Sequence, residues 1–162
     1  MTKDYTKILN GSIVKYTGHI TTIRDRPVRI KAIHKTGKII TSYTVVTKDS
    51  QGDKIDFSAA PYELEHLIVS EQDLIKLGFI NNPKDNSFFI ESVFLVHPTY
   101  IEGKADSLKY VDEGFVAVTR ALSLPYTKKD INNNSVSVQS MHILQNFLIG
   151  KILKIIDWDI LL

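Results

Sequence analysis

The chain of 162 residues contains no cysteine. This absence excludes disulfides, thiolate metal sites and cysteine nucleophiles, and it fits an intracellular protein. No stretch of about 18 apolar residues occurs, so no transmembrane helix is expected. The first residues are not followed by a long apolar run either, so the sequence predicts no signal peptide. The remaining composition, 43% hydrophobic and 23% charged, is typical of a soluble globular protein.

Basic residues are concentrated at the N-terminal end. Residues 1–40 hold nine Lys or Arg against two acidic residues, net +7, whereas residues 41–162 hold eleven against sixteen, net −5. The asymmetry has three interpretations: the solvated face of a small barrel, head-to-tail contacts between copies, or a nucleic-acid-binding face. The residues for a partner or nucleic-acid contact are Arg24, Arg26, Arg29 and Lys31. Few aromatic residues lie among them, so the base stacking typical of single-strand binders is not indicated.

Short runs rich in β-branched residues dominate the first half of the chain. Such residues suit a pleated, half-buried surface, and clusters of turn residues separate the runs. Four or five strands at a spacing of about ten residues predict a small β-barrel or a curled meander for residues 1–69. The predicted strands cover residues 8–17, 19–24, 28–32, 39–47 and 55–57.

Two short helices are predicted in the second half. The sequence Ser-Glu-Gln-Asp at 70–73 is a capping-box pattern, which predicts a helix near residues 71–77. Apolar residues recur at spacings of three and four from Met141 onward, which predicts a helix over 141–149. Gly150 offers a C-terminal end for this helix, because glycine adopts a left-handed conformation at little steric cost.

The rest of the second half is predicted to be strands and loops. The whole chain is therefore expected to be α+β with mostly antiparallel strands. It divides into halves at 1–69 and 70–162, which form two domains or one integrated domain. The predicted strands are 87–96, 114–120, 135–138 and 156–162, and the predicted loops are 99–113 and 128–134.

The C-terminal end carries two sets of residues that deserve a functional interpretation. Asp157 and Asp159 would share one face of the last strand, where two carboxylates can share a divalent ion. A solvent-exposed strand face is the alternative. The residues that alternate with these aspartates are apolar, and the opposite face of the strand that they form is predicted to be an interface with a partner. It consists of Ile156, Trp158, Ile160 and Leu162.

No catalytic, metal or cofactor site is predicted. Glu63, Glu65 and His66 are close in sequence, but alternation in an extended segment points Glu65 away from His66. No second histidine pair has metal-ligand spacing. His142 falls in the first turn of the predicted second helix, where a structural role is the more frequent one.

Two segments resemble a family of small uncharacterised proteins from phages and prophages of Bacteroidetes bacteria. Residues 69–79 (VSEQDLIKLGF) resemble the segment I/P-x-L-T-E-E-x-L-x-K-x-G-F, and residues 141–147 (MHILQNF) resemble V-H-x-L-Q-N-L/F. The family also begins with a β-rich half. This chain departs from it at Val69, at Ser70 and at 148–149, where the family usually has Leu, Thr and a Tyr-Ala pair. The resemblance implies a phage source and supplies no catalytic residues.

This source leads to an expected function. We expect a non-enzymatic virion component, either a head auxiliary or decoration protein or a subunit of a connector or tail ring. It would be assembled in the host cytoplasm, in multiple copies, through contacts with other phage structural proteins, without a cofactor or a membrane. The alternative is a nucleic-acid-binding or host-takeover module that uses the basic N-terminal half.

Overall fold

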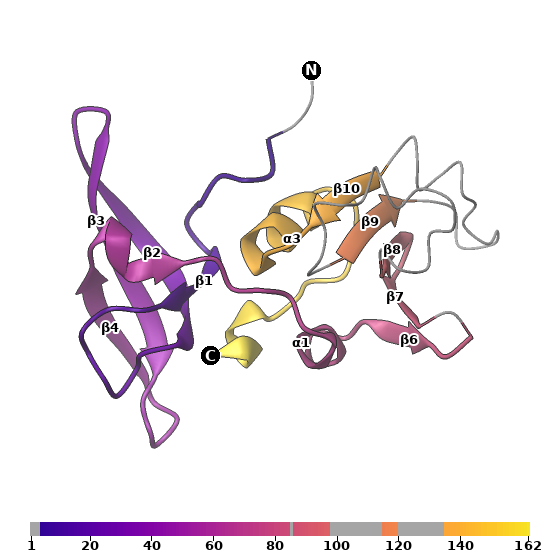
Figure 1. Cartoon of the computed structure of the whole chain (residues 1–162), viewed down its shortest axis with the longest axis horizontal. Coiled ribbons are helices and arrows are strands. Elements are labelled where there is room, and N and C mark those ends of the chain that lie inside the picture. The colour runs from indigo at the N-terminus through magenta and orange to yellow at the C-terminus, as the bar shows by residue number, and fades with distance from the viewer. Residues whose placement is uncertain (1–3, 85, 98–114, 120–134) are drawn as a thin grey trace.

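The fold is described from a computed structural model, which describes residues 4–84, 86–97, 115–119 and 135–162. Two antiparallel sheets lie side by side, and helix α3 and the C-terminal segment lie between them (Figure 1). Two short helices accompany the sheets, so the predicted α+β class with mostly antiparallel strands is confirmed. No helix in these residues is long and apolar enough to cross a membrane. The predicted loops at 99–113 and 128–134 lie outside the described residues.

The first sheet is formed by residues 13–65 and has the strand order β4-β3-β2-β1-β5. Four strands form a meander, and a 3-10 turn, η1, then brings β5 back beside β1. The sheet curls, but β4 and β5 remain its two edges, so the barrel option is not supported. Its elements are β1 (Ile13–Tyr16), β2 (Arg26–Thr36), β3 (Ile39–Lys48), β4 (Lys54–Ala59), η1 (Pro61–Glu63) and β5 (Leu64–Glu65).

The predicted strand at 19–24 is wrong, although its residues are β-branched. Tyr16 at the end of β1 pairs directly with Arg26 at the start of β2, so the intervening residues must reverse the chain. The Asp25 amide donates to the Tyr16 carbonyl over 2.6 Å, and Asp25 itself has a φ of 63°. Ile23 is buried in this turn. The apolar side chain of Ile23 therefore packs into the core from a turn, and it does not indicate a strand.

The second sheet has the order β10-β9-β8-β7-β6 among the described residues. The predicted single strand at 87–96 is wrong, because it is a hairpin of β7 and β8. Glu91 has a φ of 49° and turns the chain, so Phe88 pairs with Leu95. The hairpin buries apolar residues from both strands. The strands are β6 (Ile80–Asn82), β7 (Ser87–Ile90), β8 (Val93–Val96), β9 (Phe115–Thr119) and β10 (Ser135–Val138).

Both predicted helices are confirmed. Helix α1 (Glu71–Lys76) begins with the predicted capping box, since Ser70 Oγ accepts from the Asp73 amide over 3.2 Å and Asp73 accepts from the Ser70 amide. Helix α3 (Met141–Leu148) buries its apolar stripe, and Gly150 beyond it has the left-handed φ of 77°. Local sequence signals determine where both helices begin and end.

The predicted final strand is wrong. The chain ends in a 3-10 helix, η3 (Trp158–Leu161), whose N-terminus is capped by Asp157. The Asp157 carboxylate accepts from the Asp159 amide over 3.1 Å, and Leu161 is buried. An aspartate at an N-cap satisfies an amide that a helix leaves unpaired. This local bond favours a helical turn over the extended alternation that the sequence suggested.

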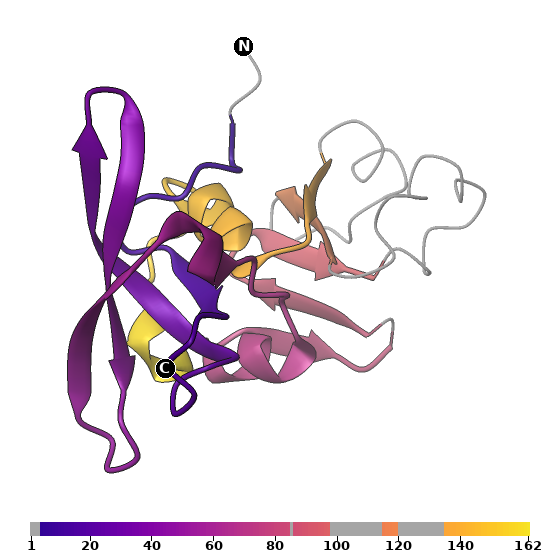
Figure 2. The same cartoon turned by 60° about the vertical axis from the view of Figure 1, so that its left-hand side comes forward.

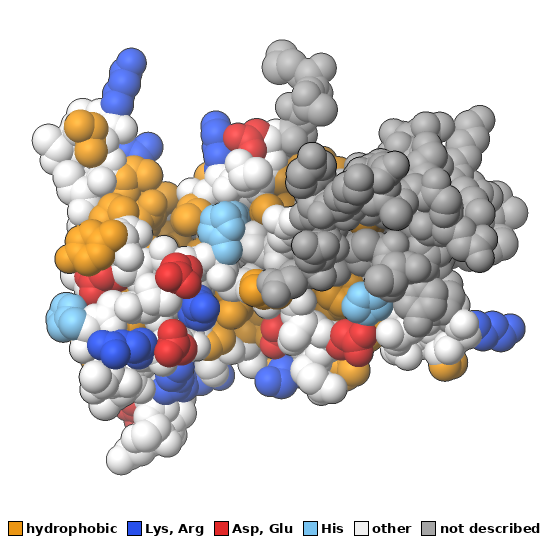
Figure 3. Space-filling view, viewed as in Figure 1, with side chains coloured by type: hydrophobic (Ala, Val, Ile, Leu, Met, Phe, Trp, Pro, Cys, Tyr) orange, Lys and Arg blue, Asp and Glu red, His pale blue; other side chains and the backbone are white. Residues whose placement is uncertain are grey.

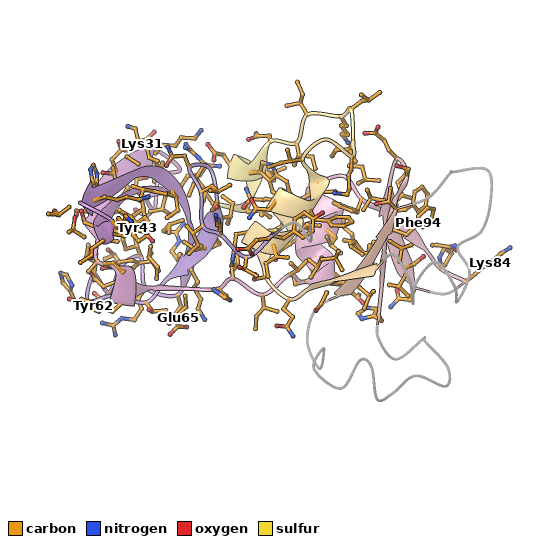
Figure 4. The ribbon with its side chains drawn as sticks, turned by 90° about the horizontal axis from the view of Figure 1, so that it is seen from above. Lys31, Tyr43, Tyr62, Glu65, Lys84 and Phe94 are labelled. Carbon is orange, nitrogen blue, oxygen red and sulfur yellow. The ribbon has the colours of Figure 1, made fainter. Side chains whose placement is uncertain are left out.

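Strand β1 contributes to two hydrophobic clusters because neighbouring side chains of a strand point to opposite faces. Ile13 is fully buried in a cluster with α1, α3 and the second sheet. Val14 and Tyr16 are fully buried in a second cluster inside the curled first sheet. Figure 4 shows Tyr43 within that curl, while the second sheet lies beyond α3. The two sheets are therefore joined through one strand of the first.

Candidate docking surface at the C-terminal segment

Helix α3 holds the N-terminal segment by its polar side chains. The Gln145 amide group makes two hydrogen bonds: its Oε1 accepts from the Ile13 amide over 2.7 Å, and its Nε2 donates to the Gly11 carbonyl over 2.9 Å. This pairing satisfies the backbone just before β1, as a neighbouring strand would. Gln145 therefore connects α3 to the first sheet.

Two further side chains of α3 bind the chain before β1. Asn146 Nδ2 donates to the carbonyls of Tyr5 and Lys7, both over 2.8 Å. His142 Nε2 lies 3.1 Å from the carbonyl of Thr6. Three consecutive carbonyls are therefore bound by one helix. The polar positions of the segment MHILQNF have a structural role that sequence reasoning missed, because nothing local indicates their distant partners.

The His142 imidazole is fully buried and carries a defined tautomer. Since a carbonyl only accepts, Nε2 carries the proton toward Thr6, and Nδ1 accepts from the Ser140 hydroxyl over 3.2 Å. The exposed His66 ring packs against it, with ring centroids 4.7 Å apart. Burial lowers the pKa of His142, and the nearby His66 lowers it further. Both effects favour the neutral imidazole of His142 in the folded protein.

The C-terminal 3-10 helix is held against the first sheet by one carboxylate. Asp159 accepts from Arg29 Nε over 2.6 Å, from Arg29 Nη2 over 3.2 Å and from Lys54 Nζ over 2.6 Å. Burial alone would raise the pKa of Asp159, but the hydrogen bonds and charges of Arg29 and Lys54 together outweigh it and lower the pKa. The Asp159 carboxylate is therefore ionised at neutral pH, where it links η3 to β2 and β4.

Between α3 and η3, a second carboxylate holds the chain. Glu91, in the β7–β8 turn, accepts from the Leu153 amide over 2.9 and 3.0 Å and from the Lys154 amide over 2.8 Å. These backbone hydrogen bonds lower the pKa of Glu91. Glu91 therefore fixes the position of the segment around Leu153 and Lys154 relative to the second sheet.

The segment that Glu91 holds presents two aliphatic side chains to solvent. Leu153 and Ile155 are each 94% exposed, while Ile152 before them and Ile156 after them pack against the core. Figure 4 shows side chains of this yellow segment pointing away from the body of the protein. Together with Ile149, which is 60% exposed, Leu153 and Ile155 form what we call the aliphatic surface. Large aliphatic groups clustered in solvent mark a contact site more often than isolated ones do.

Two shallow hollows border the aliphatic surface. They have volumes of about 190 and 240 Å³, and Gln145, Ile149 and Trp158 line both of them. Lys154 lines the first, and Leu9, which is 44% exposed, lines the second. The lining of the two hollows therefore comes from the N-terminal segment, from the end of α3 and from the C-terminal segment, which makes this region a candidate contact surface.

The predicted apolar interface falls within this region, but its residues do not form a common face. Ile156, Trp158 and Leu162 are partly buried against the core. Ile160 is 49% exposed. The 3-10 geometry of η3 is the reason, since it places side chains around a helix and not on alternate faces of a strand. The interface itself stays a prediction.

The four basic residues that the sequence predicts as contacts have different surroundings in the structure. Arg29 binds Asp159, and Lys31 forms an ion pair with Asp56 on β4. Arg24 donates to the Gly18 carbonyl over 2.9 Å and lies in the turn before β2, where Arg26 begins the strand. Three of the four side chains, those of Arg24, Arg29 and Lys31, therefore bind partners within the molecule, and the role of all four toward another molecule stays a prediction.

The acidic candidates have internal partners. Asp157 caps η3 and Asp159 binds Arg29, so the predicted carboxylate pair does not share one face. Within the residues that the structure describes, no group of three or more His, Asp or Glu residues could hold a metal ion.

Glu63 is buried at the rim of the first sheet. Its Oε1 accepts from the Ala60 amide over 3.0 Å, and its Oε2 accepts from the Tyr16 hydroxyl over 2.9 Å, with His19 Nδ1 at 3.2 Å. The Ala60 bond and then the Tyr16 and His19 contacts lower the pKa of Glu63, despite its burial. Gly18 lies directly over the carboxylate, where a Cβ would come within 2.0 Å of Oε2. The Glu63 carboxylate therefore has a structural role, because it bonds the Ala60 amide and the Tyr16 hydroxyl and packs against Gly18.

Comparison of the chain with protein-family models, with curated proteins and with solved structures finds no match.

Proposed function

We propose that this chain is a non-enzymatic structural subunit of a phage particle that acts through protein–protein contacts. The observation that supports the proposal is the aliphatic surface, in which Leu153 and Ile155 are 94% exposed on a segment that Glu91 holds in place. A surface held in one conformation loses little entropy on binding, which favours its use as a contact. The family resemblance of residues 69–79 and 141–147 supports the phage source.

The proposed occupant is an apolar segment of another particle subunit that also carries acidic residues. Lys154 is exposed on the segment that carries the aliphatic surface, and Lys7 is exposed on the N-terminal segment bound by α3. The Lys151 ammonium binds the Tyr5 hydroxyl instead. Two copies that met through this same surface would bring these like charges together, which is unfavourable. An aliphatic and acidic partner satisfies both the apolar area and the charge.

The test is the copy number of the protein in purified particles of the source phage, measured by quantitative mass spectrometry beside the infected-cell lysate. The wild type is expected at a fixed fraction of the major capsid protein. The double variant Leu153→Ser/Ile155→Ser should be depleted from particles at least fivefold while its level in the lysate stays unchanged.

The matched control is Ile75→Ser/Ile80→Ser, which removes two aliphatic side chains exposed by 53% and 57% on α1 and β6. It should enter particles as the wild type does. Absence of the wild-type protein from particles, together with abundance in the lysate, would contradict the proposal. Equal depletion of both double variants would show that general surface hydrophobicity, and not the aliphatic surface, is what counts.

A further inference from the structure

The β2–β3 hairpin extends beyond its sheet as a two-stranded arm. Strand β1 pairs with β2 only up to Arg29, and β4 pairs with β3 only from Tyr43 onward. From Ala32 to Thr36 and from Ile39 to Ser42 the two strands pair only with each other. Ala32 and Ile33 face Thr44 and Tyr43, which β4 also pairs, so at about 3.4 Å per residue the part with no third strand is about 10–14 Å long. Figures 1 and 2 show it projecting from the first sheet, opposite the β3–β4 turn.

The arm has a defined shape. Two register irregularities occur in the pairing of β2 with β3, one at the base of the arm between Ile30 and Ala32 and one within the arm between His34 and Lys35. Such bulges increase the twist of a strand pair and bend it, and they are frequent next to functional sites. Across the strands, His34 Nε2 lies 2.7 Å from the Thr44 hydroxyl. The arm is therefore a bent two-stranded ribbon, supported by a side-chain hydrogen bond between its strands, and not an irregular loop.

The charge of the arm has a single sign. Residues 30–47 include three lysines and no acidic residue. Lys31 is paired with Asp56, whereas Lys35 and Lys38 are exposed and form no ion pair with any residue in the described ranges. Next to them at the tip, Ile39 is 72% exposed. Figure 3 shows basic and hydrophobic side chains together at this corner of the surface.

We propose that this arm binds duplex nucleic acid. Lysine neutralises phosphates and releases their counterions, whereas it is depleted at the centres of protein–protein interfaces. The major groove of a duplex is wide enough for a two-stranded ribbon, and an exposed aliphatic tip suits contact with base edges or a base step. Lys35 and Lys38 contact phosphates on either side of the tip, and Ile39 enters the groove. This site is separate from the aliphatic surface and from Arg24 and Arg26.

The arm is tested by fluorescence anisotropy of a labelled random-sequence 20-base-pair DNA over a range of salt concentrations, with the full-length protein. The wild type should bind with a Kd of about 10⁻⁶ to 10⁻⁴ M, with a log K that falls linearly with log salt. Each phosphate contact adds about 0.9 to the magnitude of that slope. The variant Lys35→Gln/Lys38→Gln should therefore reduce the magnitude by about 1.8 and weaken binding at low salt by tenfold or more.

A second variant separates the apolar contribution from the electrostatic one. Ile39→Thr should weaken binding severalfold and leave the salt slope unchanged, because it removes no charge. The matched control is Lys76→Gln/Lys84→Gln, which removes two charges from exposed lysines on α1 and in the β6–β7 turn, and it should leave both quantities unchanged. Every substituted side chain is at least partly exposed, and circular dichroism verifies that each variant is folded.

Four outcomes overturn the inference, and the first three concern duplex binding. The wild type does not bind the duplex at low salt, or the arm variant retains the wild-type slope, or the control Lys76→Gln/Lys84→Gln reduces the slope as much as the arm variant does. A loss of Lys35→Gln/Lys38→Gln from particles with unchanged duplex binding would likewise overturn it, because the arm would then be a protein contact. Loss of duplex binding with normal entry into particles supports the inference, independently of the aliphatic surface.

Discussion

Single polar side chains perform connections that a strand or helix often makes in other folds. Gln145 satisfies the backbone on both sides of Ser12, and Glu91 satisfies two amides of the C-terminal segment. Each bond joins residues far apart in the sequence. Sequence reasoning could locate α3 but could not assign these roles, because the spacing of polar residues in a helix carries no information about a distant carbonyl.

His142 makes stability depend on pH. Its pKa in the folded protein lies below the ordinary value of 6.5, so the unfolded chain binds the proton more readily. The free energy of unfolding should therefore fall as the pH drops through about 6.5 and level off below the pKa of the folded state. Urea unfolding between about pH 7.5 and about pH 5.5 measures this loss.

The variant His142→Gln should lose less stability over that range than the wild type, although it is less stable at neutral pH. The control His34→Gln, on the exposed arm, should keep the wild-type dependence on pH. An unchanged dependence in His142→Gln would show that this imidazole binds protons equally in the folded and unfolded states, which contradicts the effect of burial on its pKa.

Gly18 should tolerate no side chain. A Cβ there would lie 2.0 Å from Glu63 Oε2 and 2.3 Å from the Tyr16 hydroxyl oxygen. Gly18→Ala is expected to destabilise the protein by about 1–3 kcal/mol, as overpacking of a buried site does. Gly52→Ala meets no atom within 4 Å and has a φ of 84°, so it should cost only the backbone strain of about 1–2 kcal/mol. Urea unfolding compares the two, and a cost at Gly18 below that at Gly52 contradicts the packing argument.

At the scale of elements, local chemistry predicted the ends of helices well and the ends of strands poorly. The capping box before α1 and the apolar stripe of α3 involve residues within one or two turns, so the sequence contains the whole signal. The β7–β8 turn depends on a left-handed Glu91, and η3 depends on Asp157 as a cap and on the distant Arg29. Alternation of apolar residues alone could not distinguish these from continuous strands.

The docking of η3 should depend on Asp159. Asp159→Asn removes the anion that accepts from Arg29 and Lys54, and it should lower the free energy of unfolding by about 1–3 kcal/mol. Most of this cost concerns Arg29, because water screens the half-exposed Lys54. Hydrogen exchange should also show faster exchange of the amides in η3.

Asp157→Asn is the matched control, because asparagine is as good an N-cap as aspartate. It should leave stability and exchange nearly unchanged. If Asp157→Asn destabilised the protein as much as Asp159→Asn, the total negative charge of the C-terminal segment, and not the bond to Arg29, would be responsible.

At the scale of the whole molecule, each terminal segment is bound by the part of the protein that is distant from it in sequence. The N-terminal segment before the first sheet is bound by α3, and η3 after α3 is bound by β2 and β4 of the first sheet. The predicted division at residue 69 stays a prediction about folding units. The strands of the two sheets do separate in sequence, with β5 ending at Glu65 and β6 beginning at Ile80.

The bond between Arg29 and Asp159 spans 130 residues, and the bond between Tyr5 and Asn146 spans 141. Such pairs form late, because closing a long loop must precede the gain from the contact. During synthesis the first sheet would leave the ribosome long before its partners exist. Arg29 can pair only after residue 159 has been synthesised, so a product truncated before that residue would lack the ion pair that holds η3 against the first sheet.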